Sequence, residues 1–73
     1  MMRRDKIKEK GRVIETLPSL LFRVKLESGE EILAHLGGKM KMNRIKVLPG
    51  DKVMIERSKY DEKRGILIFR LPS

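Results

Sequence analysis

The sequence predicts an all-β protein, a small barrel of five strands with one short helix between the third and fourth strands. Its apolar residues alternate with polar ones at a spacing of two, which is the period of a strand and not of a helix. Turn-forming pairs that contain glycine or proline separate the alternating runs. A chain of 73 residues forms one domain at most, and it buries only about 60% of the surface that its unfolded state exposes. We therefore expect a thin core and no deep active site.

The first strand is predicted over residues 7–16, and it carries Gly11 near its centre. A glycine inside a strand lowers stability unless the chain bends or bulges there, so we expect this strand to bend at Gly11. Pro18-Ser19 forms the turn that leads into the next strand.

The second and third strands are predicted over residues 20–26 and 32–36, and they form an antiparallel hairpin. Ser28-Gly29 lies between them, and glycine adopts the positive φ of a tight turn without steric cost. The residues of this hairpin that are expected to face the core are Phe22, Val24, Leu26, Ile32, Ala34 and Leu36.

The fourth strand is predicted over residues 52–56, after a turn at residues 49–51, and it directs Val53 and Ile55 inward. The fifth strand, over residues 66–69, is apolar on both faces, so its period does not identify an inward face.

Residues 37–48 connect the third and fourth strands. This segment opens on two glycines, and its Met40, Met42 and Ile45 are compatible with a short helical turn. Five strands with a short helix in this position is the element order of an OB-fold, whose bent first strand pairs into both halves of the barrel.

The charge of the chain is uneven. Residues 37–73 hold ten basic and four acidic side chains, a net of +6, whereas residues 1–36 hold eight and six, a net of +2. The cations that fall between residues 37 and 48, with no acid among them, are Lys39, Lys41, Arg44 and Lys46. Charge of one sign gathered on part of a small protein favours a polyanionic partner over plain solubility, which interspersed signs serve better. We expect residues 1–73 to form a single OB-fold (S1-like) RNA-binding domain, with residues 1–5 frayed.

The cations of the first strand are interpreted differently. They alternate along the strand and are expected to form its solvated face; they are Lys6, Lys8, Lys10 and Arg12.

Several functional classes are excluded by what the sequence lacks. Without cysteine it has no disulfide framework, no thiolate zinc site and no cysteine nucleophile, which suits a reducing cytoplasm. His35 is the only histidine, and no nucleophile or acid cluster stands at motif spacing from it, so we expect no catalytic residue, no metal site and no enzyme activity. The Gly37-Gly38-Lys39 run fails the phosphate-loop pattern at both ends, and no cofactor is expected. The longest apolar runs are too short for a membrane span or a signal peptide.

Only three aromatic residues are present, Phe22, Tyr60 and Phe69, and both phenylalanines are expected in the core. Single-strand binders of this fold use several exposed aromatics to stack bases, and the aromatic-rich strand motif of cold-shock proteins is missing. RNA contact is therefore predicted mainly through lysine and arginine on backbone phosphates, with arginine planes covering exposed bases. This favours a folded RNA that is recognised by its shape.

The order of the motifs along the chain is that of a known family. The residues that carry the likeness are Gly11-Arg12-Val13-Ile14-Glu15-Thr16-Leu17-Pro18, Phe22-Arg23-Val24, Gly29, Ala34-His35, Gly38-Lys39-Met40, Asn43, Ile45-Lys46, Pro49-Gly50-Asp51-Lys52-Val53, Tyr60-Asp61, Gly65 and Phe69-Arg70. On these residues the chain resembles bacterial translation initiation factor one over essentially its whole length.

The resemblance implies an OB-fold that binds the small ribosomal subunit as a monomer in the cytoplasm. The implied place is the aminoacyl-tRNA (A) site, beside the decoding helix of the 16S-type rRNA and one small-subunit ribosomal protein. It also implies action beside the other two bacterial initiation factors, in which occlusion of the A site steers initiator tRNA to the neighbouring peptidyl site.

The resemblance also implies which residues face RNA. The family's RNA-facing positions correspond here to Lys39, Lys41, Lys46, Arg64 and Arg70. To these we add Arg44, from the acid-free segment, and the outward His35. With Arg64 and Arg70 facing outward at the ends of the fifth strand, Leu67 and Phe69 are predicted to face inward.

The chain departs from the family pattern at four positions and in its tail, which reads Leu71-Pro72-Ser73 where the family has a basic residue. The family commonly has Tyr at 44, a basic residue at 42, Pro at 59 and Arg at 66, where this chain has Arg44, Met42, Lys59 and Ile66. The change at 66 removes one expected RNA contact, and the cations that are candidates to replace it are Arg44, Arg57 and Lys63.

Two other functional classes stay open. One is a general RNA chaperone or cold-shock-like protein, which would bind many RNAs with equal affinity. The other is a protein–protein adaptor of the same fold, which would bind RNA weakly and with little dependence on salt.

Overall fold

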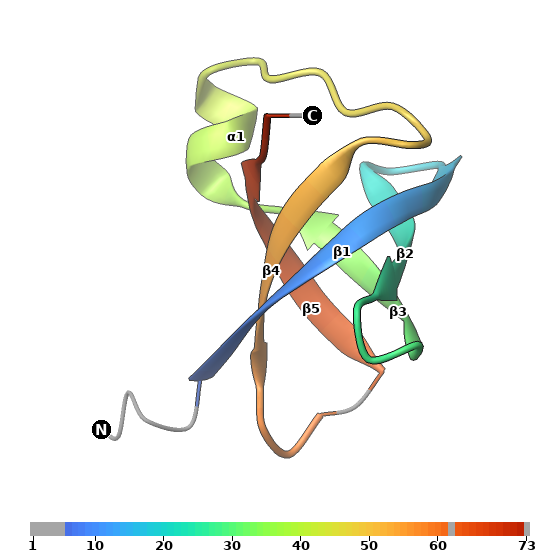
Figure 1. Ribbon diagram of the computed structural model, residues 1–73. Coiled ribbons are helices and arrows are strands. Elements are labelled where there is room, and N and C mark those ends of the chain that lie inside the picture. The colour runs from blue at the N-terminus through green and yellow to red at the C-terminus, as the bar shows by residue number, and fades with distance from the viewer. Residues whose placement is uncertain (1–5, 62, 73) are drawn as a thin grey trace.

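The computed structural model describes residues 6–61 and 63–72, which form five strands and one short helix. The elements are β1 (Lys6–Leu17), β2 (Leu21–Leu26), β3 (Glu31–Leu36), α1 (Gly38–Met42), β4 (Lys52–Ser58) and β5 (Arg64–Arg70). The strands close into a barrel in the order β1-β2-β3-β5-β4, in which β3 and β5 pair in parallel and the other neighbours pair antiparallel (Figure 1). The predicted OB-fold is confirmed, whereas the predicted fraying of residues 1–5 falls outside the described residues. None of the helices in the described part of the chain is long and apolar enough to span a membrane.

Barrel closure depends on β1, which pairs with β4 through its first half and with β2 through its second half. The two pairings overlap at Gly11 and Arg12, so this part of β1 belongs to both halves of the barrel. A Cβ atom at Gly11 would lie 2.6 Å from Cγ1 of Val24 and 2.9 Å from the carbonyl oxygen of Lys25. The close approach of β2 therefore requires a glycine at position 11, whereas the register of β1 on β2 shifts between Val13 and Glu15.

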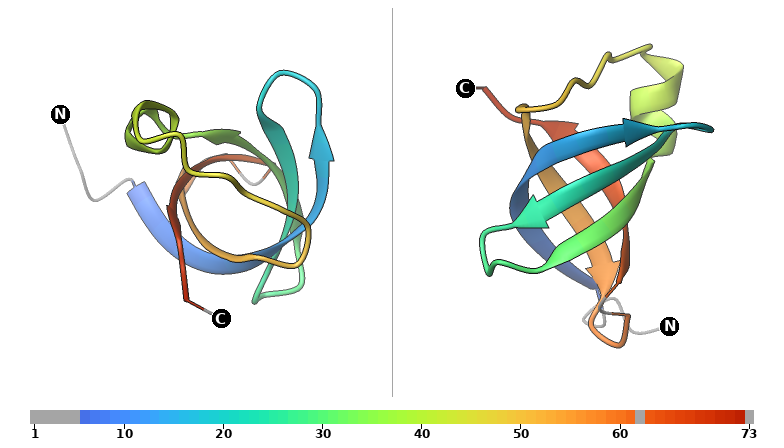
Figure 2. Two further views of the ribbon diagram at one scale, coloured as in Figure 1. Left: turned by 90° about the horizontal axis from the view of Figure 1, so that it is seen from above. Right: turned by 90° about the vertical axis from the view of Figure 1, so that its right-hand side faces the viewer.

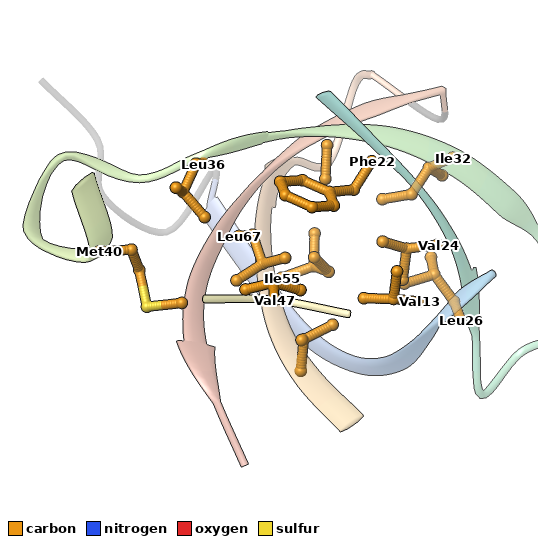
Figure 3. Close-up of a cluster of buried hydrophobic side chains, with 12 residues drawn as sticks. Val13, Phe22, Val24, Leu26, Ile32, Leu36, Met40, Val47, Ile55 and Leu67 are labelled. Atoms are coloured by element: carbon orange, nitrogen blue, oxygen red, sulfur yellow. The ribbon is translucent and has the colours of Figure 1, made fainter. Parts of the chain in front are cut away.

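The core is an apolar cluster inside the barrel (Figure 3). Its members are Val13, Phe22, Val24, Leu26, Ile32, Ala34, Leu36, Met40, Val47, Val53, Ile55 and Leu67. Every residue predicted to face inward on β2, β3 and β4 belongs to it. The alternation identified these faces because one side of each strand is packed and the other is solvated.

The inward face of β5 was predicted only in part. Leu67 is fully buried, but the prediction for Phe69 is wrong, since Phe69 is 56% exposed. The ladder with β4 shifts register between Met54 and Ile55, which pair with Phe69 and Leu67 respectively. Ile68 is thus an extra residue on β5, and a bulge of this kind turns the residue that follows it to the other face.

Two of the predicted turns, one in a hairpin and one in a loop, contain a glycine at positive φ. Gly29 has a φ of 98° in the β2–β3 turn, and Gly50 has a φ of 95° in the turn before β4. The turn after β1 instead uses Ser19 and Leu20 in the left-handed region, at φ 67° and 57°.

Candidate nucleic-acid interface

The segment between β3 and β4 is held against the barrel by its apolar side chains. Met40 and Val47 are buried, and Ile45 packs against the core from a half-buried position. Figure 3 shows Met40 reaching from α1 toward the cluster. The cations that alternate with these apolar residues are all exposed: Lys39, Lys41, Arg44 and Lys46. We call this set the loop cations.

The backbone conformation of Arg44 is set by a Schellman motif at the end of α1. The N–H of Ile45 donates to the carbonyl of Met40 at 3.0 Å, and the N–H of Arg44 donates to the carbonyl of Lys41 at 3.1 Å. Arg44 has a φ of 53°, which is the left-handed conformation that such a motif requires and that glycine usually supplies. A cation therefore occupies a strained backbone position on the exposed side of the segment.

Gly37 joins this segment to β5. Its N–H donates to the carbonyl oxygen of Leu67 at 2.8 Å, and a Cβ atom at Gly37 would lie 2.8 Å from the same oxygen. Gly37 is buried, and this close backbone approach requires a glycine there.

Arg70, the last residue of β5, is brought to the loop cations. Its Nη1 donates to the carbonyl oxygen of Lys46 at 2.9 Å, a contact between residues 24 positions apart in the chain. The arginine keeps an exposed side chain and four further N–H donors for a ligand. The structure thus brings Arg70 to the segment that carries the loop cations, and we call the exposed surface of this segment together with Arg70 the α1 face.

The exposed Phe69 belongs to the same face. A hollow of about 270 Å³ separates α1 from the end of β5, and its lining includes Lys39, Asn43, Ile45, Phe69 and Arg70. An aromatic ring among cations is the arrangement that proteins use to stack an unpaired base. Sequence reasoning missed Phe69; the available signal was that β5 is apolar on both faces, although a strand of a small barrel has only one face toward the core.

Arg64 and His35 occupy other places. Arg64 begins β5 and Arg70 ends it, so six residue steps of about 3.3 Å separate them by roughly 20 Å along the strand. Arg64 is exposed but is not part of the α1 face. His35 is exposed on β3, two residues before the buried Gly37, and its neighbour on β5 is Ile66, which is 41% exposed.

Two arginines outside the α1 face form ion pairs with glutamates. Arg57 forms an ion pair of 2.6 Å with Glu9, and its side chain is only 11% exposed. Arg23 forms one of 3.1 Å with Glu15. Within residues 6–61 and 63–72, the loop cations have no such partner. Arg57 is therefore poorly suited to make the RNA contact that an arginine at position 66 would supply, while the loop cations stay available to an anionic ligand.

The chain matches the family described as translation initiation factor 1A / IF-1 over residues 2–73. The solution structure of the translation initiation factor IF-1 from the Wolbachia endosymbiont strain TRS of Brugia malayi is similar, with 38% identity and a TM-score of 0.77. That match covers 93% of this chain and 80% of the other.

Two larger proteins contain a similar domain. YjeQ from Thermotoga maritima matches 90% of this chain with 27% identity and a TM-score of 0.72, over 23% of its own length. YloQ, a circularly permuted GTPase, matches 99% of this chain with 23% identity and a TM-score of 0.74, over 25% of its own length. The second of these similarities concerns the fold alone. On the family match and the similarity to the Wolbachia factor, this chain belongs to the translation initiation factor 1A / IF-1 family.

Proposed function

We propose that this chain acts in translation initiation by binding the small ribosomal subunit at its A site through the α1 face. The observation that supports this most directly is the grouping of four loop cations and Arg70 on one side of the barrel, with no acid of the described residues paired to the loop cations. Backbone phosphates are the ligands that such a surface attracts, and the decoding region of 16S-type rRNA supplies them.

The contacts differ in kind across the surface. Lys39, Lys41 and Lys46 act as point charges on phosphates, and Arg70 adds a planar donor beside them. Phe69 offers its ring to a base that has left its stack. Arg64 and His35 make separate contacts, with other parts of the subunit, because neither lies in the loop segment.

Binding at the A site would block that site to tRNA. A bound barrel about 30 Å across occludes the site and so steers initiator tRNA to the peptidyl site. In this proposal the factor works as a monomer in the cytoplasm, without cofactor or catalysis. Its partners are the rRNA, one small-subunit ribosomal protein and the other two bacterial initiation factors.

The test is equilibrium binding of a labelled chain to purified small subunits over a series of salt concentrations. Lys41→Ala should weaken binding and lower the magnitude of the slope of log affinity against log salt by about 0.7–0.9. The reason is that the variant makes one phosphate contact fewer and so releases fewer counterions on binding. The matched control is Lys8→Ala, an exposed lysine on β1 that should leave both quantities unchanged.

A competition experiment with A-site tRNA tests whether the chain binds the small subunit at the A site. Loss of binding when the A site is filled supports the proposal. Equal affinity for unrelated RNAs would support an RNA chaperone instead, and binding to subunits that does not respond to salt would support a protein adaptor.

A further inference from the structure

A row of three cations, none of them a residue of the α1 face, crosses the outside of the barrel. Arg12 on β1 is in register with Lys25 on β2 and with Lys52 on β4. All three are exposed. Directly opposed residues in neighbouring strands have Cα atoms about 4.5–5.5 Å apart, so the row places like charges side by side. On β2 the row ends against Glu31 of β3, which is the register partner of Lys25.

This row does not stabilise the fold. Like charges directly opposite one another on a sheet are destabilising, and the register places no acid between these three. Arg12 has a structural contact, since its Nη1 donates to the carbonyl oxygen of Gly50 at 2.9 Å. Within the described residues, the side chains of Lys25 and Lys52 form no hydrogen bond or ion pair. The interpretation of the β1 cations as a merely solvated face therefore leaves their alignment with β2 and β4 unexplained.

The row borders a groove with an apolar lining. Its volume is about 760 Å³, and it runs between the middle of β1, the end of β2 and the residues after β5. Its apolar walls include Ile14, which is 42% exposed, together with Leu71 and Pro72. Its charged residues are Lys10, Arg12, Lys25, Lys52 and one acid, Glu27. The groove shares no lining residue with the hollow between α1 and β5, and both views of Figure 2 place the C-terminal end and α1 on different sides of the barrel.

We propose that this groove is a second interaction surface, which binds an acidic, leucine-rich or similarly apolar segment of a partner protein. The cations select carboxylates by charge, and the apolar walls select aliphatic side chains by burial. Three neighbouring strands span about 10 Å. In a polyproline II segment, which has about three residues per turn and rises about 3.1 Å per residue, side chains at every third position lie on one face, about 9 Å apart. A segment of this conformation that lies across the strands with an acid at every third position therefore meets both ends of the row.

RNA is the less suitable occupant. No aromatic residue of the described part of the chain lines the groove, so it lacks a platform for bases. Arg12 keeps four N–H donors beside the one that it gives to Gly50, so the apolar walls, and not the cations, distinguish an apolar acidic segment from RNA. Carboxylates on an apolar segment use both features of the groove, whereas phosphates use only one.

The experiment titrates the labelled chain with a peptide of about ten residues, built from glutamate, leucine and serine with a glutamate at every third position. Amide chemical shifts should move at Gly11, Lys25, Lys52 and Leu71 and stay still on α1. Lys52→Glu should weaken peptide binding by about threefold to tenfold, since an exposed ion pair is replaced by a repulsion. Its Tm should be unchanged or higher, because the new acid faces Arg12.

Three comparisons decide the result. Lys25→Gln should also weaken binding, whereas Lys41→Glu, a matched reversal on α1, should leave peptide binding within twofold and weaken only small-subunit binding. Equal losses for Lys41→Glu and Lys52→Glu would overturn the groove as the site, as would shifts confined to α1 or no shifts at all. Tighter groove binding by a single-stranded RNA than by the peptide would overturn the protein partner.

Discussion

Replacement of Arg44 by glycine is expected to raise the stability of the fold and to weaken the proposed binding to RNA. The left-handed backbone costs a residue with a Cβ atom about 1–2 kcal/mol. Arg44 carries this cost at φ 53°, while both hydrogen bonds of the Schellman motif are made by backbone groups that remain in the variant. Glycine relieves the strain but loses about 0.5–1 kcal/mol through the greater freedom of the unfolded chain. The net expectation for Arg44→Gly is a stabilisation of about 0.5–1 kcal/mol.

For a chain of this size, that gain raises Tm by about 2–8 °C, which differential scanning calorimetry resolves. Arg44→Ala is the matched control, because alanine keeps the Cβ atom and the strain and removes the same cation. It should melt close to the wild type. Both variants should weaken binding to small subunits to a similar extent, since both lose the charge.

Two results would refute this reasoning. If the glycine variant melts no higher than the alanine variant, the backbone at Arg44 stores no strain. If both variants bind small subunits as tightly as the wild type does, Arg44 takes no part in the RNA contact, and the strained position has another explanation.

Further predictions concern β5 and the attachment of α1. Leu67→Ala should lower the free energy of unfolding by about 2–5 kcal/mol in denaturant melts, because Leu67 is fully buried. Phe69→Ala should lower it by less than about 1 kcal/mol and should weaken small-subunit binding; equal losses of stability for the two variants would mean that Phe69 is in the core after all. Gly37→Ala should destabilise the fold by about 1–3 kcal/mol, since its Cβ atom would meet a β5 carbonyl oxygen at 2.8 Å. A Gly37→Ala variant that melts like the wild type would show that α1 moves away at no cost.

Much of the fold follows from local features of the sequence. The inward faces of β2, β3 and β4 could be predicted because each strand has one packed side, and a period of two is visible without knowledge of the partner strand. The turns at Gly29 and Gly50 could be predicted because positive φ is a property of single residues. The loop cations were identified because they lie within one short segment of the chain, and the motifs that carry the family resemblance are likewise read along the sequence.

What only the tertiary structure decided depends on which residues meet across strands. The bulge at Ile68, and with it the exposure of Phe69, arises from the register of β5 on β4 and not from the apolar composition of β5. The contact of Arg70 with Lys46 and the separation of Arg64 from the α1 face follow from the direction in which β5 crosses the barrel. The row of Arg12, Lys25 and Lys52 joins residues from three strands, because β1 pairs with both β2 and β4 at Arg12. A short turn fixes the register within a hairpin, but β1 on β4 and β3 on β5 join segments far apart in the chain, and a bulge alters the register of β5 on β4. These pairings depend on the packing of the whole core.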